Sequence, residues 1–319
     1  MKRRHLTLLA NALVLLLLYG IGGVYFKNFL TLRVFVNLLG DNAFMGIAAI
    51  GMTFVIISGG IDLSVASVIA FTSIFIAQTV HDGLHPWWAM AMALCLGWLF
   101  GATQGWLISF FELPPFLVTL SGMFFARGMG YIVNDVSLAI KHGVYSQTIR
   151  NLAIPLAKNV RLPFTAQCFI LFILAGTFLL AFTRFGRYIY AIGSNEASAR
   201  LMGVPVHRMK ILIYALSGFC AAASGCVVTF YMQSGNSSSF VGLEMDAIAS
   251  AVIGGTLLSG GVGGVPGTFL GAIILGLIQA LISFHGNLNN WWAKIFIGIL
   301  LFLFISIQQL LSRRLRAAR

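Results

Sequence analysis

Charged residues are scarce in this chain of 319 residues: Asp, Glu, Lys and Arg together make up 9%, whereas hydrophobic residues make up 59%. A soluble domain carries roughly 25% charged residues, so a soluble fold of this size could not cover its surface. Disorder is excluded because it requires low hydrophobicity and high charge. Four cysteines are too few for a disulfide-stapled secreted domain. The composition therefore predicts an all-α, polytopic transmembrane helix bundle.

Catalytic patterns are also missing. The six histidines form no His-x-x-x-His pair on a predicted helix, and the four cysteines form no Cys-x-x-Cys pair. There is no Gly-x-Ser-x-Gly nucleophile motif. The glycine-rich run 260–267 lacks the Lys-Ser/Thr pair that holds the phosphates of ATP in a phosphate-binding loop. We therefore expect no enzyme, no metal site and no cofactor in this chain.

The net charge of +12 comes from basic residues gathered at the ends of apolar runs. Three lie among the first four residues, five lie between 184 and 210, and four lie in the C-terminal tail. Basic residues at helix ends mark the cytoplasmic side of a membrane protein, so we expect both termini and the 184–210 loop in the cytoplasm. No basic stripe with interleaved aromatics is present, which argues against nucleic-acid binding.

Ten apolar runs are long enough, or nearly so, to cross the bilayer, which requires about 20 residues. They cover about 6–26, 41–58, 65–80, 88–112, 116–133, 166–183, 211–233, 246–262, 267–284 and 291–311. Several are short and broken by glycine, and an eight-span arrangement would also keep both termini inside. We expect one transmembrane domain over 1–319, with a periplasmic loop at about 134–165.

Glycine is concentrated at two places, Ser58–Ser64 and 254–267. Glycine destabilises a regular helix, so these runs are expected to be non-helical. Non-helical backbone at membrane depth is tolerated only where protein or a water-filled cavity shields it. Broken helices of this kind mark the path of many transporters. The alternative is a pair of surface turns, with Asp62 or Ser64 capping the next helix. The candidate path residues from these two places are Gly59, Gly60, Asp62, Ser64, Gly260 and Gly261.

Arg127 is the one charge well inside an apolar run. An ionisable residue within the membrane is a functional candidate, and Arg127 joins the candidate path on that ground. The alternatives are that its guanidinium caps backbone carbonyls at a helix end or pairs with an acid such as Asp62.

The cytoplasmic loop contains a short predicted helix from Asn195 to Met202. Ser194 or Asn195 is a good N-cap, Glu196 lies favourably in the first turn, and Gly203 is placed to end the helix. A helix this short is marginal alone. It is either a surface helix without a partner or a docking element.

Four motifs, in order, resemble those of permease subunits in bacterial ATP-binding-cassette importers for monosaccharides, the ribose-permease type. They are Ser58–Ser64, Leu113–Leu120, the loop segment Gly193–Val204, and Leu258–Thr268. The resemblance covers about residues 30–310, and the whole sequence looks close to one of the two permeases of the galactofuranose importer.

The resemblance implies a bacterial inner-membrane permease that works with three partners: a cytoplasmic ATPase that binds the ATP, a second permease (homologous or identical), and a periplasmic sugar-binding protein. It also implies that the short cytoplasmic helix couples the permease to the ATPase, with close approach at Ala199 and Gly203. The coupling residues are Gly193, Asn195, Glu196, Ala199, Arg200 and Gly203. The alternative from the residues alone is an ion-coupled secondary carrier of a small polar solute.

Overall fold

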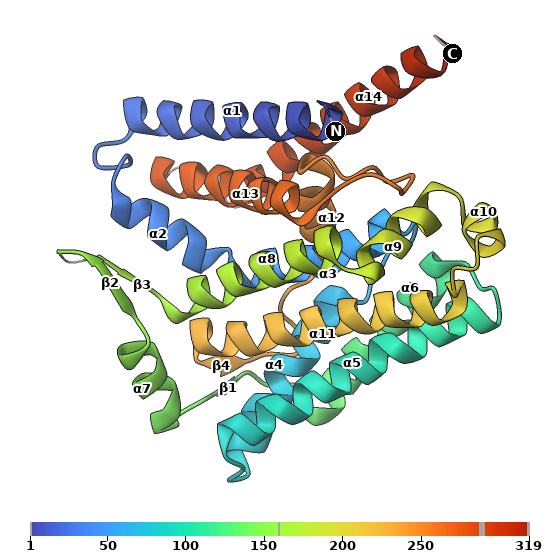
Figure 1. The fold of residues 1–319 in the computed structure, drawn as a ribbon. Helices are drawn as coiled ribbons and strands as arrows, with labels where there is room; N and C mark the ends of the chain where they lie inside the picture. Colours follow the sequence, from blue (N-terminus) through green and yellow to red (C-terminus); the bar gives the residue numbers. More distant parts are fainter. Residues whose placement is uncertain (1, 159, 287–290, 318–319) are drawn as a thin grey trace.

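Each of the ten apolar runs forms a helix or contains one in the computed structural model, which describes residues 2–158, 160–286 and 291–317. The helices are α1 (Lys2–Tyr25), α2 (Leu32–Asp41), α3 (Ala43–Ile57), α4 (Val65–His81), α5 (Pro86–Phe110), α6 (Pro115–Val133), α7 (Gly143–Asn151), α8 (Phe164–Phe182), α9 (Arg184–Ser194), α10 (Glu196–Leu201), α11 (Val206–Met232), α12 (Leu243–Ile253), α13 (Val265–His285) and α14 (Trp291–Ala317). The strands are β1 (Leu138–Ala139), β2 (Ile154–Ala157), β3 (Val160–Leu162) and β4 (Ser234–Gly235). The structure is therefore mostly helical, as predicted, and also contains four short strands that the sequence analysis did not predict (Figure 1).

The number of spans differs from the ten that the sequence suggested. Within the described residues, six helices are long and apolar enough to cross a membrane: α1, α5, α6, α8, α11 and α13. A seventh results if α2 and α3, which meet at 56°, are counted together. The other runs yield shorter helices because non-helical segments interrupt them: α4 has 17 residues and α12 has 11.

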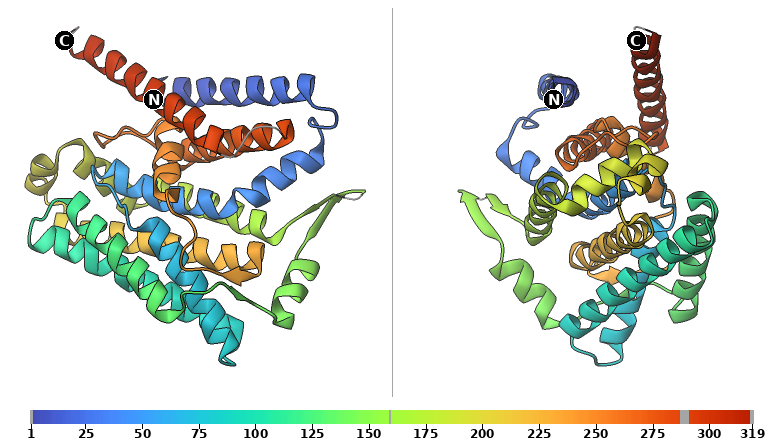
Figure 2. Two further views of the ribbon diagram at one scale, coloured as in Figure 1. Left: turned by 180° about the vertical axis from the view of Figure 1, so that it is seen from behind. Right: turned by 45° about the vertical axis from the view of Figure 1, so that its right-hand side comes forward.

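The two ends of the bundle differ in what they contain. α1 begins, and α14 ends, toward the end where α10 lies, and α7 with the β2–β3 hairpin lies at the opposite end (Figures 1 and 2). This arrangement agrees with both termini and the 184–210 loop lying on one side of the membrane. Which side is cytoplasmic stays a prediction from the basic residues.

The predicted loop 134–165 is folded. β1 pairs with β4, and β2 pairs with β3, both antiparallel. Tyr145 of α7 is 1% exposed, its hydroxyl lies 3.1 Å from Thr229 Oγ1, and its ring centroid lies 4.6 Å from that of Phe230. The loop therefore docks on the end of α11.

The core is built around α3, of which every residue except Phe44 is buried. α11 packs along α3, α4 and α5. The α5–α11 contact is close enough that a Cβ on Gly218 would lie 2.2 Å from the Gly97 carbonyl oxygen. Small residues allow helix backbones to approach in this way, where hydrophobicity alone does not drive helices together in lipid.

Candidate functional site

The first glycine-rich segment, Ser58–Ser64, connects α3 to α4 as non-helical backbone inside the bundle. Gly59 has φ +87°, a conformation that L side chains rarely adopt. Asp62 is 1% exposed. Its Oδ1 accepts hydrogen bonds from the backbone N–H (3.0 Å) and hydroxyl (2.6 Å) of Ser64, and its Oδ2 accepts one from Ser217 Oγ of α11 (2.7 Å). A buried carboxyl group requires such partners.

Two further contacts fix this segment. The Ile61 carbonyl accepts hydrogen bonds from Thr119 Oγ1 of α6 (3.3 Å) and from the Tyr214 hydroxyl of α11 (3.4 Å). A Cβ on Gly60 would lie 2.3 Å from that same hydroxyl oxygen. The segment is therefore a non-helical break that hydrogen bonds anchor to α6 and α11. Asp62 also binds the N–H of Ser64, the residue before α4, as the capping alternative expected.

The second glycine-rich segment lies between α12 and α13 and contains the same tripeptide: Ser259-Gly260-Gly261 corresponds to Ser58-Gly59-Gly60. Gly260 and Gly261 have φ +81° and +75°. Pro266 then lies in the first turn of α13, where its missing N–H costs nothing.

The two breaks meet, together with the end of α9. The Gly261 N–H donates to the Ile57 carbonyl (2.8 Å), which joins the second break to the end of α3. A Cβ on Gly193 would lie 1.7 Å from the Ile57 carbonyl oxygen, and one on Gly260 would lie 2.8 Å from the Gly193 carbonyl oxygen. Three segments far apart in sequence thus touch through their backbones, and only glycine fits at Gly193.

The 184–210 loop, which we predict to be cytoplasmic, contains two helices before α11. Sequence patterns indicated only the second; α9 is additional, and its N-cap Thr183 accepts a hydrogen bond from the Gly186 N–H (3.3 Å). For α10 the N-cap is Asn195, whose side chain accepts from the Ser198 N–H (2.8 Å). Gly203, with φ +81°, ends the helix as predicted.

The residues of α10 that are buried and exposed differ from those that we expected. Ala199, where we expected close approach of a partner, is 0% exposed and belongs to the chain's own hydrophobic core. Leu201 and Met202 are instead 90% and 71% exposed. The Glu196 carboxylate binds Lys210 of α11 at 2.8 Å and lies 3.3 Å from Arg200, so α10 is held to α11 and presents two large apolar side chains outward.

Arg127 does not pair with Asp62. Its Nη1 donates to the carbonyls of Ser237 (3.1 Å) and Ser239 (2.7 Å), in the loop between β4 and α12. This matches the carbonyl-binding alternative, except that the carbonyls belong to a loop rather than to a helix end. Arg127 therefore holds that loop against α6.

Some residues of the site were missed by sequence reasoning. Ser217 and Gln104 belong to the Asp62 network: Ser64 Oγ lies 3.3 Å from Gln104 Oε1. Gln104 is 3% exposed. A signal for Gln104 exists in the sequence, since it is a polar residue between Gly101 and Gly105 in an apolar helix. Ser217 gives no comparable signal, because serine is common at helix contacts in membranes.

Comparisons with known proteins agree on one family. Residues 34–305 match the family model described as "Branched-chain amino acid transport system / permease component". The chain is 48% identical over 310 residues to the inner membrane ABC transporter permease protein YjfF of Escherichia coli (strain K12), covering 97% of this chain and 93% of that protein. It is 35% identical to the fructose import permease protein FruG of Bifidobacterium longum (97% and 92% covered) and 35% identical to the ribose import permease protein RbsC of Escherichia coli (84% and 84% covered). No solved structure matches.

Proposed function

Because the chain belongs to this family of transport permease components, we propose that it forms the translocation path of an ATP-driven importer for a monosaccharide. Membership makes the chain a transport subunit and a multi-pass protein of the bacterial inner membrane. The proposal of a monosaccharide is supported by relatives that are named as ribose and fructose import permeases. An ion-coupled carrier has no support from these relatives.

For the substrate we propose galactofuranose, on the resemblance of the sequence motifs to permeases of galactofuranose importers. The test is uptake of labelled galactofuranose, ribose and fructose by cells that express this chain with the importer genes beside it. We expect ATP-dependent uptake of galactofuranose. Uptake of ribose or fructose alone would keep the monosaccharide importer and reject galactofuranose.

The proposed assembly contains a cytoplasmic ATPase, a second permease and a periplasmic sugar-binding protein. The single observation that best supports it is α10. α10 is held to the rest of the chain by Glu196 and Ala199, yet its last residue Leu201 and its C-cap Met202 are exposed together at the end of the bundle. Neighbouring exposed apolar side chains of this size favour a protein contact. We propose that these two side chains insert into a groove of the ATPase.

The connection from α10 to the path is short. Asn195, the cap of α10, lies two residues after Gly193, which touches both glycine breaks. A displacement of α10 by the ATPase would therefore be transmitted to the backbone at Ile57 and Gly261. The coupling residues and the candidate path residues would then move together when the ATPase displaces α10.

The docking proposal is tested with Leu201→Glu, which places a charge at the centre of the proposed contact. We expect loss of most of the ATPase on co-purification from membranes and loss of sugar-stimulated ATP hydrolysis, because a charge buried at an interface is strongly unfavourable. Val136→Glu is the matched control: Val136 is 63% exposed in the loop before β1, at the opposite end. Normal ATPase recovery and stimulation with Leu201→Glu would reject α10 as the docking helix.

A further inference from the structure

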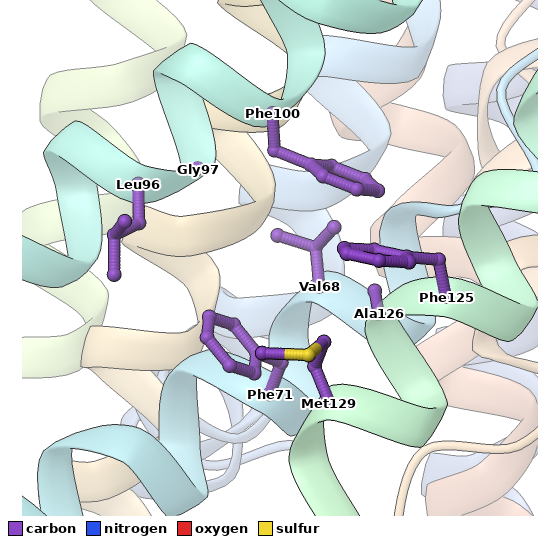
Figure 3. A pocket seen from close by; sticks show the side chains of 8 residues that line it. All are labelled: Val68, Phe71, Leu96, Gly97, Phe100, Phe125, Ala126 and Met129. Carbon is purple, nitrogen blue, oxygen red and sulfur yellow. The ribbon is translucent and has the colours of Figure 1, made fainter.

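Two cavities lie along α5 and α6 and share a pair of aromatic rings. The first, of about 170 Å³, is lined by α4, α5 and α6 (Figure 3). The second is an open groove of about 510 Å³ between α5 and α6. Phe100 and Phe125 line both, and their rings stack with centroids 6.2 Å apart and an interplanar angle of 12°. Figure 3 shows the Phe100 ring above Val68 and the Phe125 ring beside Val68, above Ala126, so both rings belong to the wall that the two cavities share.

Gln104 lies in the wall of the groove, and its hydrogen bonding is incomplete. Its side chain is 3% exposed, and Nε2 has no hydrogen-bond partner among the described residues. That nitrogen lies on the α6 side, since a Cβ on Gly122, another lining residue, would lie 2.1 Å from it. An unpaired buried amide donor costs free energy, which a ligand acceptor in the groove would recover.

The other polar groups of the groove are hydroxyls. Thr103 of α5 and Ser121 of α6 are exposed and line it, and none of its lining residues is charged. Small-molecule sites are mostly apolar cavities of about 300–1,000 Å³ with a few placed polar groups. Such a lining favours a neutral solute that has both hydroxyl groups and an apolar face.

We propose that the α5–α6 groove binds the ring of a neutral polyhydroxylated solute. The Gln104 amide N–H donates to one hydroxyl oxygen of the solute, and the exposed face of Phe125 contacts its C–H face. This site deepens the proposed function and rests on it, because a monosaccharide is a solute of this class. The Asp62–Ser64 network lies on the other side of Gln104, with Ser64 Oγ 3.3 Å from Gln104 Oε1, and would not touch the solute.

The first test compares Gln104→Leu with the wild type in the complete importer. We expect the KM for galactofuranose uptake to rise about tenfold, the equivalent of one hydrogen bond. For the one mono-deoxygenated analogue that lacks the partner hydroxyl, Gln104→Leu and the wild type should have the same KM, which a merely structural role would not produce. Gln147→Leu, at an exposed glutamine of α7, is the matched control and should change neither value.

The second test asks whether water reaches the groove. In a chain whose Cys95 and Cys168 are replaced by serine, Thr103→Cys and Ser121→Cys should react with a membrane-impermeant methanethiosulfonate, and excess galactofuranose should slow the reaction. Leu174→Cys is the control, since Leu174 is 64% exposed on α8 and should contact lipid. Groove cysteines as unreactive as Leu174→Cys would overturn the proposal.

The two proposals fail differently. If the wild-type importer takes up no monosaccharide, the proposed function fails and the groove site fails with it. If the wild type imports galactofuranose while Gln104→Leu raises KM equally for every analogue, only the groove assignment is wrong.

Discussion

The two glycine breaks begin with the same Ser-Gly-Gly tripeptide but are stabilised by different means. In the first, Asp62 accepts three hydrogen bonds from Ser64 and Ser217. In the second, the corresponding position is Gly263, whose carbonyl accepts a hydrogen bond from the Tyr190 hydroxyl of α9 (2.8 Å). Side-chain hydrogen bonds therefore hold the first break to α11 in the core and the second to α9, while the Gly261–Ile57 backbone bond joins the second break to the end of α3.

This difference assigns the two breaks different mechanical roles. A buried carboxyl group with three donors is costly to move, because each lost bond leaves a buried polar group unsatisfied. The second break has no such carboxyl group, and its side-chain hydrogen bond joins it to α9. Gly193 contacts both breaks, and we expect the first to act as a fixed frame and the second to move more when α10 is displaced.

The largest effect is expected from Gly193→Ala, which changes the point where the two breaks meet. The added Cβ would lie 1.7 Å from the Ile57 carbonyl oxygen and 2.6 Å from the Gly261 nitrogen, so the Ile57–Gly261 hydrogen bond must open. Overpacking of this kind costs about 1–3 kcal/mol or more. We expect uptake to be abolished and the unfolding temperature in detergent to fall.

Gly128→Ala is the control for this change. It lies in α6, and its added Cβ would have no atom within 4 Å, so it should behave as the wild type. If Gly193→Ala takes up sugar at the wild-type level, the close contact between α9 and the two breaks is not needed for transport. The different mechanical roles assigned to the two breaks would then be wrong.

The ends of the short helix α10 could be predicted from the sequence. The contacts that join α9 to the two glycine breaks could not. The N-cap and the stop of α10 depend on a few neighbouring residues: the sequence placed the cap at Ser194 or Asn195 and the stop at Gly203, and the structure has Asn195 and Gly203. The meeting of Gly193 with Ile57 and Gly261 depends on helix packing over long sequence separations, for which a single sequence gives no signal. Ala199 was misassigned for the same reason: a small residue on a short helix fits a partner's groove or the chain's own core equally well.

The ends of the apolar spans were predicted inaccurately for a different reason. Apolar composition predicts where helices can lie in lipid, but it does not show where a glycine-rich segment ends the helix. The run 246–262 is helical only to Ile253 and then turns through Gly254 and Gly255. Gln104 has a local signal, because it lies between Gly101 and Gly105 in an apolar helix, but a single sequence does not show that α6 lies beside it and forms a groove.

A smaller effect on stability is expected from substitutions of Asp62 in the first break. Asp62→Leu leaves the donors of Ser64 and Ser217 unpaired in the core, and loss of hydrogen bonds to a buried charged group costs about 1.5–3 kcal/mol each. Asp62→Asn keeps one carbonyl oxygen for Ser64 and can donate to the Ser217 oxygen. We therefore expect the unfolding temperature to fall strongly with leucine and slightly with asparagine. Equal losses from both variants would show that the negative charge matters, rather than the geometry of the acceptors.

The smallest effect is expected from Tyr190→Phe, which keeps the ring and removes the hydroxyl that binds the Gly263 carbonyl. A hydrogen bond of this kind contributes about 0.5–1.5 kcal/mol, so the unfolding temperature should hardly change. If the second break follows α9 through this bond, the number of sugar molecules imported per ATP hydrolysed should fall severalfold in the reconstituted importer.

Ser58→Ala is the control in the first break. The Ser58 hydroxyl donates only to the Val55 carbonyl of its own helix (2.7 Å), so this variant should leave the ratio unchanged. A Tyr190→Phe importer with the normal ratio would show that the backbone contacts at Gly193 suffice to transmit the motion, and that the two breaks differ in structure but not in role.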